Sequence, residues 1–168
     1  MTLSFFLYSS LSPSPAAMGD LDLVVKTCNG VEDRQFCIVT FAYDPRSLAA
    51  GDAGGLARIA AEYAASNATG IIDYLTQLGG DSVAVEVENG CRVEYSNAVQ
   101  GLGETLRDLG SNNYGGAAAA VGAAAGKPAA CEKLFRDRGR EYPSELAHWA
   151  EILQSLCRVS REIIVQLH

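Results

Sequence analysis

Apolar residues recur at steps of three and four positions through most of the chain after residue 50. This spacing places them on one face of an α-helix, and such a face must be buried against another element. Asp52 can cap a first helix, whose apolar face consists of Leu56, Ile59, Ala60, Tyr63, Ile71, Tyr74 and Leu78. A second face consists of Cys91, Tyr95, Ala98, Leu102, Leu106 and Leu109. The pattern predicts long amphipathic helices that pack on one another.

The approach to the second helix carries a conflicting local signal. Residues 83–88 alternate with the period of a β-strand. An isolated strand, however, could not satisfy its backbone N–H and C=O groups, and no partner strand is visible in the sequence. We therefore predict that this segment is helical.

Two further helices follow. Residues 114–125 are rich in alanine, which forms helix readily and allows a neighbouring backbone to approach closely. After a break at Gly126, Pro128 is well placed in the first turn of a short continuation. The last helix is predicted to begin near Pro143 with Ser144 as its cap. Its apolar face consists of Leu146, Trp149, Ala150, Leu153, Leu156, Cys157, Ile164 and Leu167.

Four long helices joined by short connections predict an all-α fold, an up-down-up-down four-helix bundle. Residues 20–44 carry few apolar positions in helical register, so we expect them to form an extension that the bundle core does not need. The chain has 168 residues, of which 48% are hydrophobic. This length and composition suit a single domain with one core.

The charge balance bears on possible partners. Twenty acidic residues against thirteen basic residues give a net charge of -7. A protein that binds the phosphates of nucleic acid needs a clustered positive surplus, so a nucleic-acid partner is not expected. No apolar run approaches the roughly 20 residues that span a bilayer, so no membrane contact of that kind is expected either.

The N-terminus resembles a secretory signal peptide. A short apolar block up to Leu11 is followed by small residues and prolines that suit cleavage after Ala16. We therefore predict a signal peptide over residues 1–16 and a mature domain over residues 17–168. A protein exported in this way would be located outside the cell.

The chain has five cysteines: Cys28, Cys37, Cys91, Cys131 and Cys157. They include no C-x-x-C pair and only two histidines accompany them, which argues against a metal site. In a secreted chain, four of them would form two disulfides in one of three connectivities. Local pairing favours Cys28 with Cys37 and Cys91 with Cys131. Cys157 would then remain a buried, inert thiol, whereas five reduced thiols in a cytosolic protein are the alternative.

A search for catalytic motifs returns little. The sequence has no G-x-S-x-G, no H-E-x-x-H and no phosphate-binding glycine loop. Gly101-Leu102-Gly103 lies inside a helical pattern and lacks the preceding strand of a dinucleotide site. We therefore expect neither enzyme activity nor a cofactor.

Several short motifs together resemble the plant invertase and pectin methylesterase inhibitor family. They are the Cys28 and Cys37 pair, Asp44-Pro45-Arg46-Ser47, Leu56-Ala57-Arg58-Ile59-Ala60, Cys91-x3-Tyr95-x2-Ala98 and Ala130-Cys131-x3-Phe135. The segment LARIAAEYAASNATGIIDYL is especially similar to the invertase-inhibitor branch that includes pollen allergens. The resemblance implies a secreted four-helix bundle with a short, disulfide-stapled N-terminal helical hairpin. It also implies that the first cysteine pairs with the second and the third with the fourth, and that the protein has no catalytic activity.

The resemblance further implies a target-binding segment. Inhibitors of invertase in this family reach the catalytic carboxylates with a Pro-Lys-Phe segment before the third bundle helix. The corresponding stretch here is Asn112-Asn113-Tyr114, in which only the aromatic residue is retained. Together with Ser111, these residues are the candidate target-binding segment. Loss of the lysine predicts weak or absent inhibition of invertase.

Three functions are compatible with the sequence. The first is a secreted protein inhibitor that binds one-to-one over the active-site cleft of a plant pectin methylesterase or acid invertase. The second is a structural or allergen-like homologue that keeps the stapled bundle but does not inhibit. The third is a small hydrolase, which would require clustered titratable side chains in a pocket.

Overall fold

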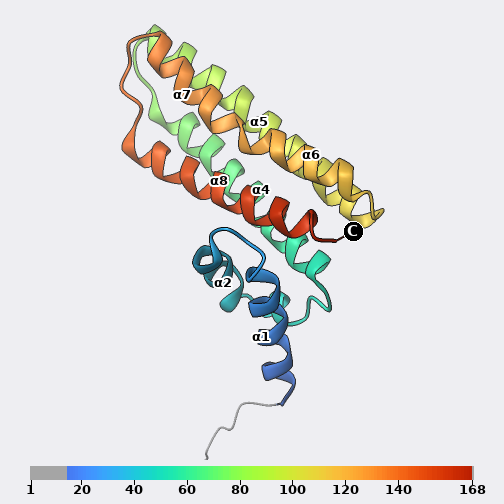
Figure 1. Cartoon of the computed structure of the whole chain (residues 1–168). Helices are drawn as coiled ribbons and strands as arrows, with labels where there is room; N and C mark the ends of the chain where they lie inside the picture. The colour runs from blue at the N-terminus through green and yellow to red at the C-terminus, as the bar shows by residue number, and fades with distance from the viewer. Residues whose placement is uncertain (1–14, 168) are drawn as a thin grey trace, which may run out of the picture.

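The computed structural model describes residues 15–167, with side chains from residue 21 onward, and every regular element in this range is an α-helix (Figure 1). Most of the predicted signal peptide, residues 1–16, therefore lies outside the described residues. The helices are α1 (Pro15–Cys28), α2 (Arg34–Ala42), α3 (Pro45–Leu48), α4 (Ala53–Leu78), α5 (Ser82–Gly110), α6 (Tyr114–Ala125), α7 (Lys127–Asp137) and α8 (Ser144–Ile164). Within the described range, no helix combines the length and apolar character that a bilayer crossing requires.

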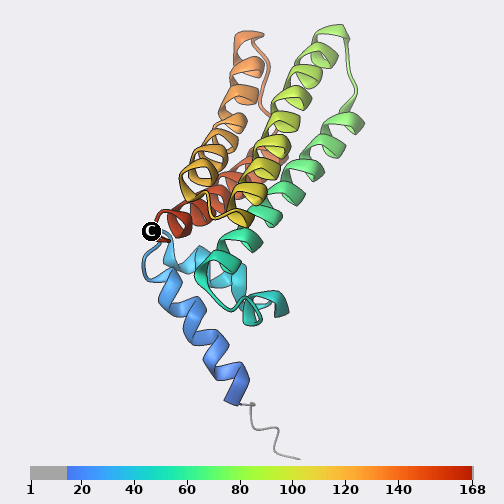
Figure 2. The same cartoon turned by 90° about the vertical axis from the view of Figure 1, so that its right-hand side faces the viewer.

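The long helices form the predicted four-helix bundle. α4, α5, the α6–α7 pair and α8 lie side by side, and each runs opposite to the one before it (Figures 1 and 2). α7 continues the direction of α6 after Gly126, so the two together make the third member of the bundle. The all-α, up-down-up-down prediction is confirmed.

The helix starts follow local side-chain chemistry. Asp52 accepts a hydrogen bond from the backbone N–H of Gly55 at 2.8 Å, as predicted for the cap of α4. Asp81 caps α5 in the same way, and residues 83–88 are helical. The cap assigned to Ser144 is wrong, because Pro143 occupies the N-cap position and no side chain bonds to the first turn of α8.

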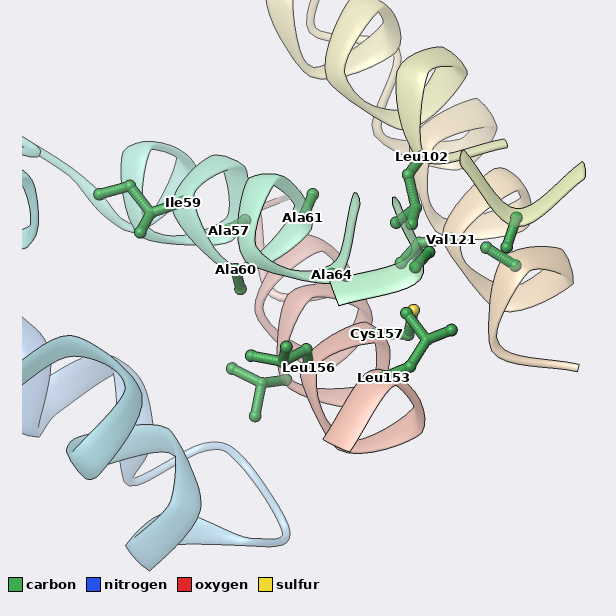
Figure 3. Close-up of a cluster of buried hydrophobic side chains, with 14 of the residues drawn as sticks. Ala57, Ile59, Ala60, Ala61, Ala64, Leu102, Val121, Leu153, Leu156 and Cys157 are labelled. Carbon is green, nitrogen blue, oxygen red and sulfur yellow. The ribbon is translucent and has the colours of Figure 1, made fainter. Parts of the chain in front are cut away.

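Small side chains let the bundle helices approach closely. Figure 3 shows the alanines on one face of α4 near Leu153 and Leu156 of α8. Between α5 and α6, a Cβ added at Gly101 would lie 3.4 Å from the carbonyl oxygen of Ala120. The alanine-rich helix therefore packs against its neighbour almost backbone to backbone, as its composition predicted.

Two disulfides are present, and they join different parts of the fold. Cys28–Cys37 connects α1 to α2, and Cys91–Cys131 connects α5 to α7. Cys157 is a free thiol that is 1% exposed and lies beside Leu153 (Figure 3). Burial raises the pKa of the Cys157 thiol to about 12.

We expect Cys157 to resist alkylation in the folded protein. Burial blocks access of the reagent, and the raised pKa leaves little thiolate near pH 8. Iodoacetamide labelling with and without urea, followed by non-reducing peptide mapping, measures this. The map should show both disulfides and label Cys157 only in urea, whereas Cys157 in a bridge or fast native labelling would contradict the assignment.

The N-terminal hairpin belongs to the core, contrary to the expectation for residues 20–44. Val24, Val31 and Phe41 are at most 5% exposed and lie in the same hydrophobic cluster as the bundle residues. The loop between α1 and α2 is also tied to α8, because Glu32 donates its backbone N–H to Glu162 at 2.8 Å. The sequence pattern missed this because each short helix contributes only a few apolar residues, too few to show a period.

Candidate target-binding site

The segment 111–114 forms the turn between α5 and α6. It lies at the end of the bundle that carries the C-terminus and the hairpin (Figures 1 and 2). Ser111, Asn112 and Asn113 are exposed, and Tyr114 is partly buried. Asn112 has a φ of 57°, a left-handed conformation that asparagine tolerates better than most residues. The turn is therefore a tight, solvent-facing corner.

Hydrogen bonds within the turn fix its shape. Asn113 Oδ1 accepts from the backbone N–H of Gly116 at 3.2 Å, and its Nδ2 donates to Asp108 Oδ1 at 3.1 Å. The hydroxyl of Tyr114 donates to Asn112 Oδ1 at 3.0 Å. Asn113 thus serves as the N-cap of α6, so its side chain is already engaged inside the molecule.

A cavity of about 180 Å³ borders this turn. It is lined by Asp52, Gly54, Gly55, Arg58, Leu109, Asn112 and Tyr114. The structure therefore brings two members of the predicted segment, Asn112 and Tyr114, together with the start of α4. It leaves Ser111 and Asn113 outside this lining.

Arg58 is the residue of this region to which the sequence assigned no role. Its Nη2 donates to the carbonyl oxygen of Leu106 at 3.2 Å. A Cβ at Gly110 would lie 3.3 Å from that nitrogen, so the glycine leaves room for the guanidinium. Arg58 belongs to the motif Leu56-Ala57-Arg58-Ile59-Ala60 of the family resemblance. Only the fold shows that it lies beside a turn about fifty residues further along the chain.

A second cluster of charged groups joins the hairpin to the bundle. Asp44, which is 7% exposed, bonds to Arg46 at 2.8 Å and accepts from the hydroxyl of Tyr63 at 2.8 Å. Arg46 also pairs with Glu62 of α4 at 2.6 Å. The hydrogen bonds from Arg46, with that from Tyr63, lower the pKa of Asp44 to about 2 despite its burial. Each of these groups is paired with a neighbour, so the cluster links the hairpin to the bundle. It does not contain a nucleophile hydrogen-bonded to a general base, as a catalytic site would.

We expect this cluster to contribute to acid sensitivity. The pKa of Asp44 is lower in the folded protein than its ordinary value near 4 in the unfolded chain. The ionised carboxylate therefore stabilises the folded protein above about pH 4, and this stabilisation is lost as the pH falls to about 2. Urea unfolding at pH 5 and pH 2 measures the effect. The wild-type protein should lose more stability between these pH values than Asp44→Asn does. Equal losses would show that Asp44 contributes nothing to the pH dependence.

Among the residues with described side chains, no three of His, Cys, Asp and Glu gather as they would around a metal ion. The α5–α6 turn is exposed and uncharged from Ser111 to Asn113, and the half-buried Arg58 lies beside it. Such a surface suits contact with another macromolecule.

Comparison with known proteins shows which family the chain belongs to. The family model described as plant invertase/pectin methylesterase inhibitor matches residues 22–163. The rice (Oryza sativa subsp. japonica) protein "Pectinesterase inhibitor 28" is 33% identical over 165 residues, covering 91% of this chain and 72% of the rice protein. A "Pectinesterase inhibitor" of Actinidia deliciosa is 26% identical over 163 residues, covering 95% of this chain and 86% of its own.

Two solved structures share the fold. A crystal structure of a mutant form of a pectin methylesterase inhibitor from Arabidopsis has a TM-score of 0.71 at 22% identity, covering 84% of this chain and 94% of the other. The pectin methylesterase inhibitor from Arabidopsis thaliana has a TM-score of 0.64 at 20% identity, covering 86% and 95%. With a family model that spans nearly the whole chain, the protein belongs to the plant invertase/pectin methylesterase inhibitor family.

Proposed function

We propose that this protein is a secreted inhibitor that binds a pectinesterase one-to-one over its active-site cleft and has no catalytic activity of its own. The observation that carries the proposal is the 33% identity to a pectinesterase inhibitor across 91% of this chain. The helical core and the two disulfides give the protein a rigid surface, which suits an inhibitor because little entropy is lost on binding.

The choice of pectinesterase over invertase rests on the α5–α6 turn. Invertase inhibitors of the family place a lysine there, and this chain has Asn113. The side chain of Asn113 caps α6 and bonds to Asp108, so it offers a target no charge and is held in place by one accepted and one donated hydrogen bond. Arg58 does not replace the lysine, because its guanidinium is held against the carbonyl of Leu106.

The location and the charge fit an extracellular encounter. Two disulfides persist in an oxidising compartment, which supports secretion to the cell wall. The net charge of -7 favours association with a basic target and makes the rate of association sensitive to salt.

An inhibition titration tests the proposal. The oxidised protein is added to purified pectinesterase and, separately, to acid invertase, and residual activity is measured at increasing ratios. Pectinesterase activity should fall to an endpoint at one inhibitor per enzyme, and the complex should elute as a heterodimer in size exclusion. Invertase should keep its activity. Inhibition of invertase alone would show that the target is misassigned.

The alternative is a homologue that keeps the stapled bundle without inhibiting. The neutral α5–α6 turn also favours this alternative. A homologue that no longer binds a target enzyme could equally have lost the lysine that Asn113 replaces. Absence of inhibition and of complex formation with either enzyme would select this alternative. A pull-down from plant cell-wall extract would then identify the partner.

A further inference from the structure

A cavity of about 560 Å³ lies along the seam between α6 and α8. Its α6 side is built from alanines and Gly122, and its α8 side carries Gln154, Cys157, Arg158 and Arg161. This volume lies within the range of about 300–1,000 Å³ that small-molecule sites occupy. The small residues of α6 make the cavity wide enough for a ligand to approach the helix backbone.

The two arginines give this groove a positive charge. Arg158 and Arg161 are one helical turn apart on α8, so both side chains lie on the same side of the helix. Arg161 extends toward α6, because a Cβ at Gly122 would lie 3.5 Å from its Nε. Its side chain therefore lies along the groove, where it remains exposed and accessible to a ligand.

Neither guanidinium has a partner among the described residues, although acidic residues outnumber basic ones in the chain by twenty to thirteen. Other cations of the chain, such as Arg46, Lys127 and Arg138, are paired with carboxylates. A guanidinium presents a planar fork of donors that matches a carboxylate. Two unpaired guanidinium groups on the same side of α8 indicate a site for a ligand with more than one carboxylate.

The rest of the groove restricts the ligand further. Its floor of small residues has no deep apolar pocket of the kind that anchors a large side chain of a protein partner. Gln154 adds an amide that can donate to and accept from hydroxyl groups. Beyond Gln154 the seam continues into a cavity of about 250 Å³ that is lined in part by Glu132 and Glu151, which would repel an anion. The anionic ligand is thus confined to the arginine end.

We propose that the α6–α8 groove binds a short run of uronic-acid units from de-esterified pectin. This choice of ligand rests on the proposed function, since an esterase acting on pectin leaves free carboxylates on a chain of hydroxylated sugar rings. Carboxylates bond to Arg158 and Arg161, and ring hydroxyls bond to Gln154. The groove would hold the inhibitor at places in the wall where its target enzyme has already acted.

The test is isothermal titration of the full, oxidised protein with an oligogalacturonate, with its methyl-esterified counterpart as the uncharged control. We expect binding of the free acid that weakens with added salt and no binding of the ester. The double variant Arg158→Gln/Arg161→Gln should bind the acid at least about tenfold more weakly. A matched double variant, Arg34→Gln/Arg136→Gln, removes the same charge from exposed positions elsewhere and should bind within about twofold of the wild type.

Four results would overturn the proposal: no binding of the acid at millimolar concentration, equal binding of the ester, equal losses in both double variants, or equally tight binding of a glutamate oligomer. The last result would assign the groove to an acidic protein segment instead. Thermal melting of each variant shows that it is folded before titration. Because no pectinesterase is present, failure of this titration is separate from failure of the inhibition titration.

Discussion

Phe41→Ala is expected to lower the free energy of unfolding of the whole protein by about 3–5 kcal/mol. Phe41 lies on α2 of the hairpin, is 0% exposed and belongs to one hydrophobic cluster with Leu56 of α4 and Ile163 of α8. Removing its ring leaves a cavity that a tightly packed core closes only in part. Domains of this size are stable by only about 5–15 kcal/mol, so the loss is a large share of the total.

Urea unfolding followed by far-ultraviolet circular dichroism measures this loss. The matched control is Val39→Ala on the same helix, where Val39 is 52% exposed and truncation should cost less than about 1 kcal/mol. A single transition should persist in both variants if the hairpin and the bundle unfold together. A loss below about 1 kcal/mol for Phe41→Ala, or two separate transitions, would show that the hairpin is independent of the core.

The bundle could be predicted from the sequence because its helices are long. Over 26 residues in α4 or 29 in α5, the apolar spacing repeats often enough to identify one face. The length of α5 also explains why residues 83–88 are helical although their apolar residues alternate as in a strand. The cap at Asp81 and the many helical residues that follow stabilise helix more than a short alternating pattern favours strand. The packing of the hairpin into the core could not be predicted, because α2 has nine residues, of which only Cys37 and Phe41 are buried. Two buried positions are too few to show a helical period.

The sites depend on pairs of distant segments, so only part of each site could be predicted from the sequence. The turn 111–114 is continuous and could be located by its resemblance, but its internal hydrogen bonds and its neighbour Arg58 depend on the fold. The pair Arg158 and Arg161 is unremarkable in a helix of mixed charge. It becomes a candidate site only because the alanines of α6 lie across from it.

The second large effect concerns the α5–α6 turn. Asn113→Lys is expected to give inhibition of acid invertase that the wild-type protein lacks. In the family resemblance this position faces the catalytic carboxylates, and a desolvated cation against a buried anion is worth about 2–5 kcal/mol, more than tenfold in affinity. The substitution also removes the side chain that caps α6, which costs about 1 kcal/mol of stability.

Asn113→Ala is the matched control, because it loses the same cap without adding a cation. Inhibition constants against invertase and pectinesterase are measured for the wild type and both variants. The lysine variant should bind invertase more than about tenfold more tightly than the alanine variant. Both should inhibit pectinesterase to the same extent, since we expect the exposed faces of the bundle helices, rather than this side chain, to contact that enzyme. Equal invertase inhibition by the two variants would show that this turn does not face the catalytic carboxylates, and the recognition segment would then have to lie elsewhere on the bundle.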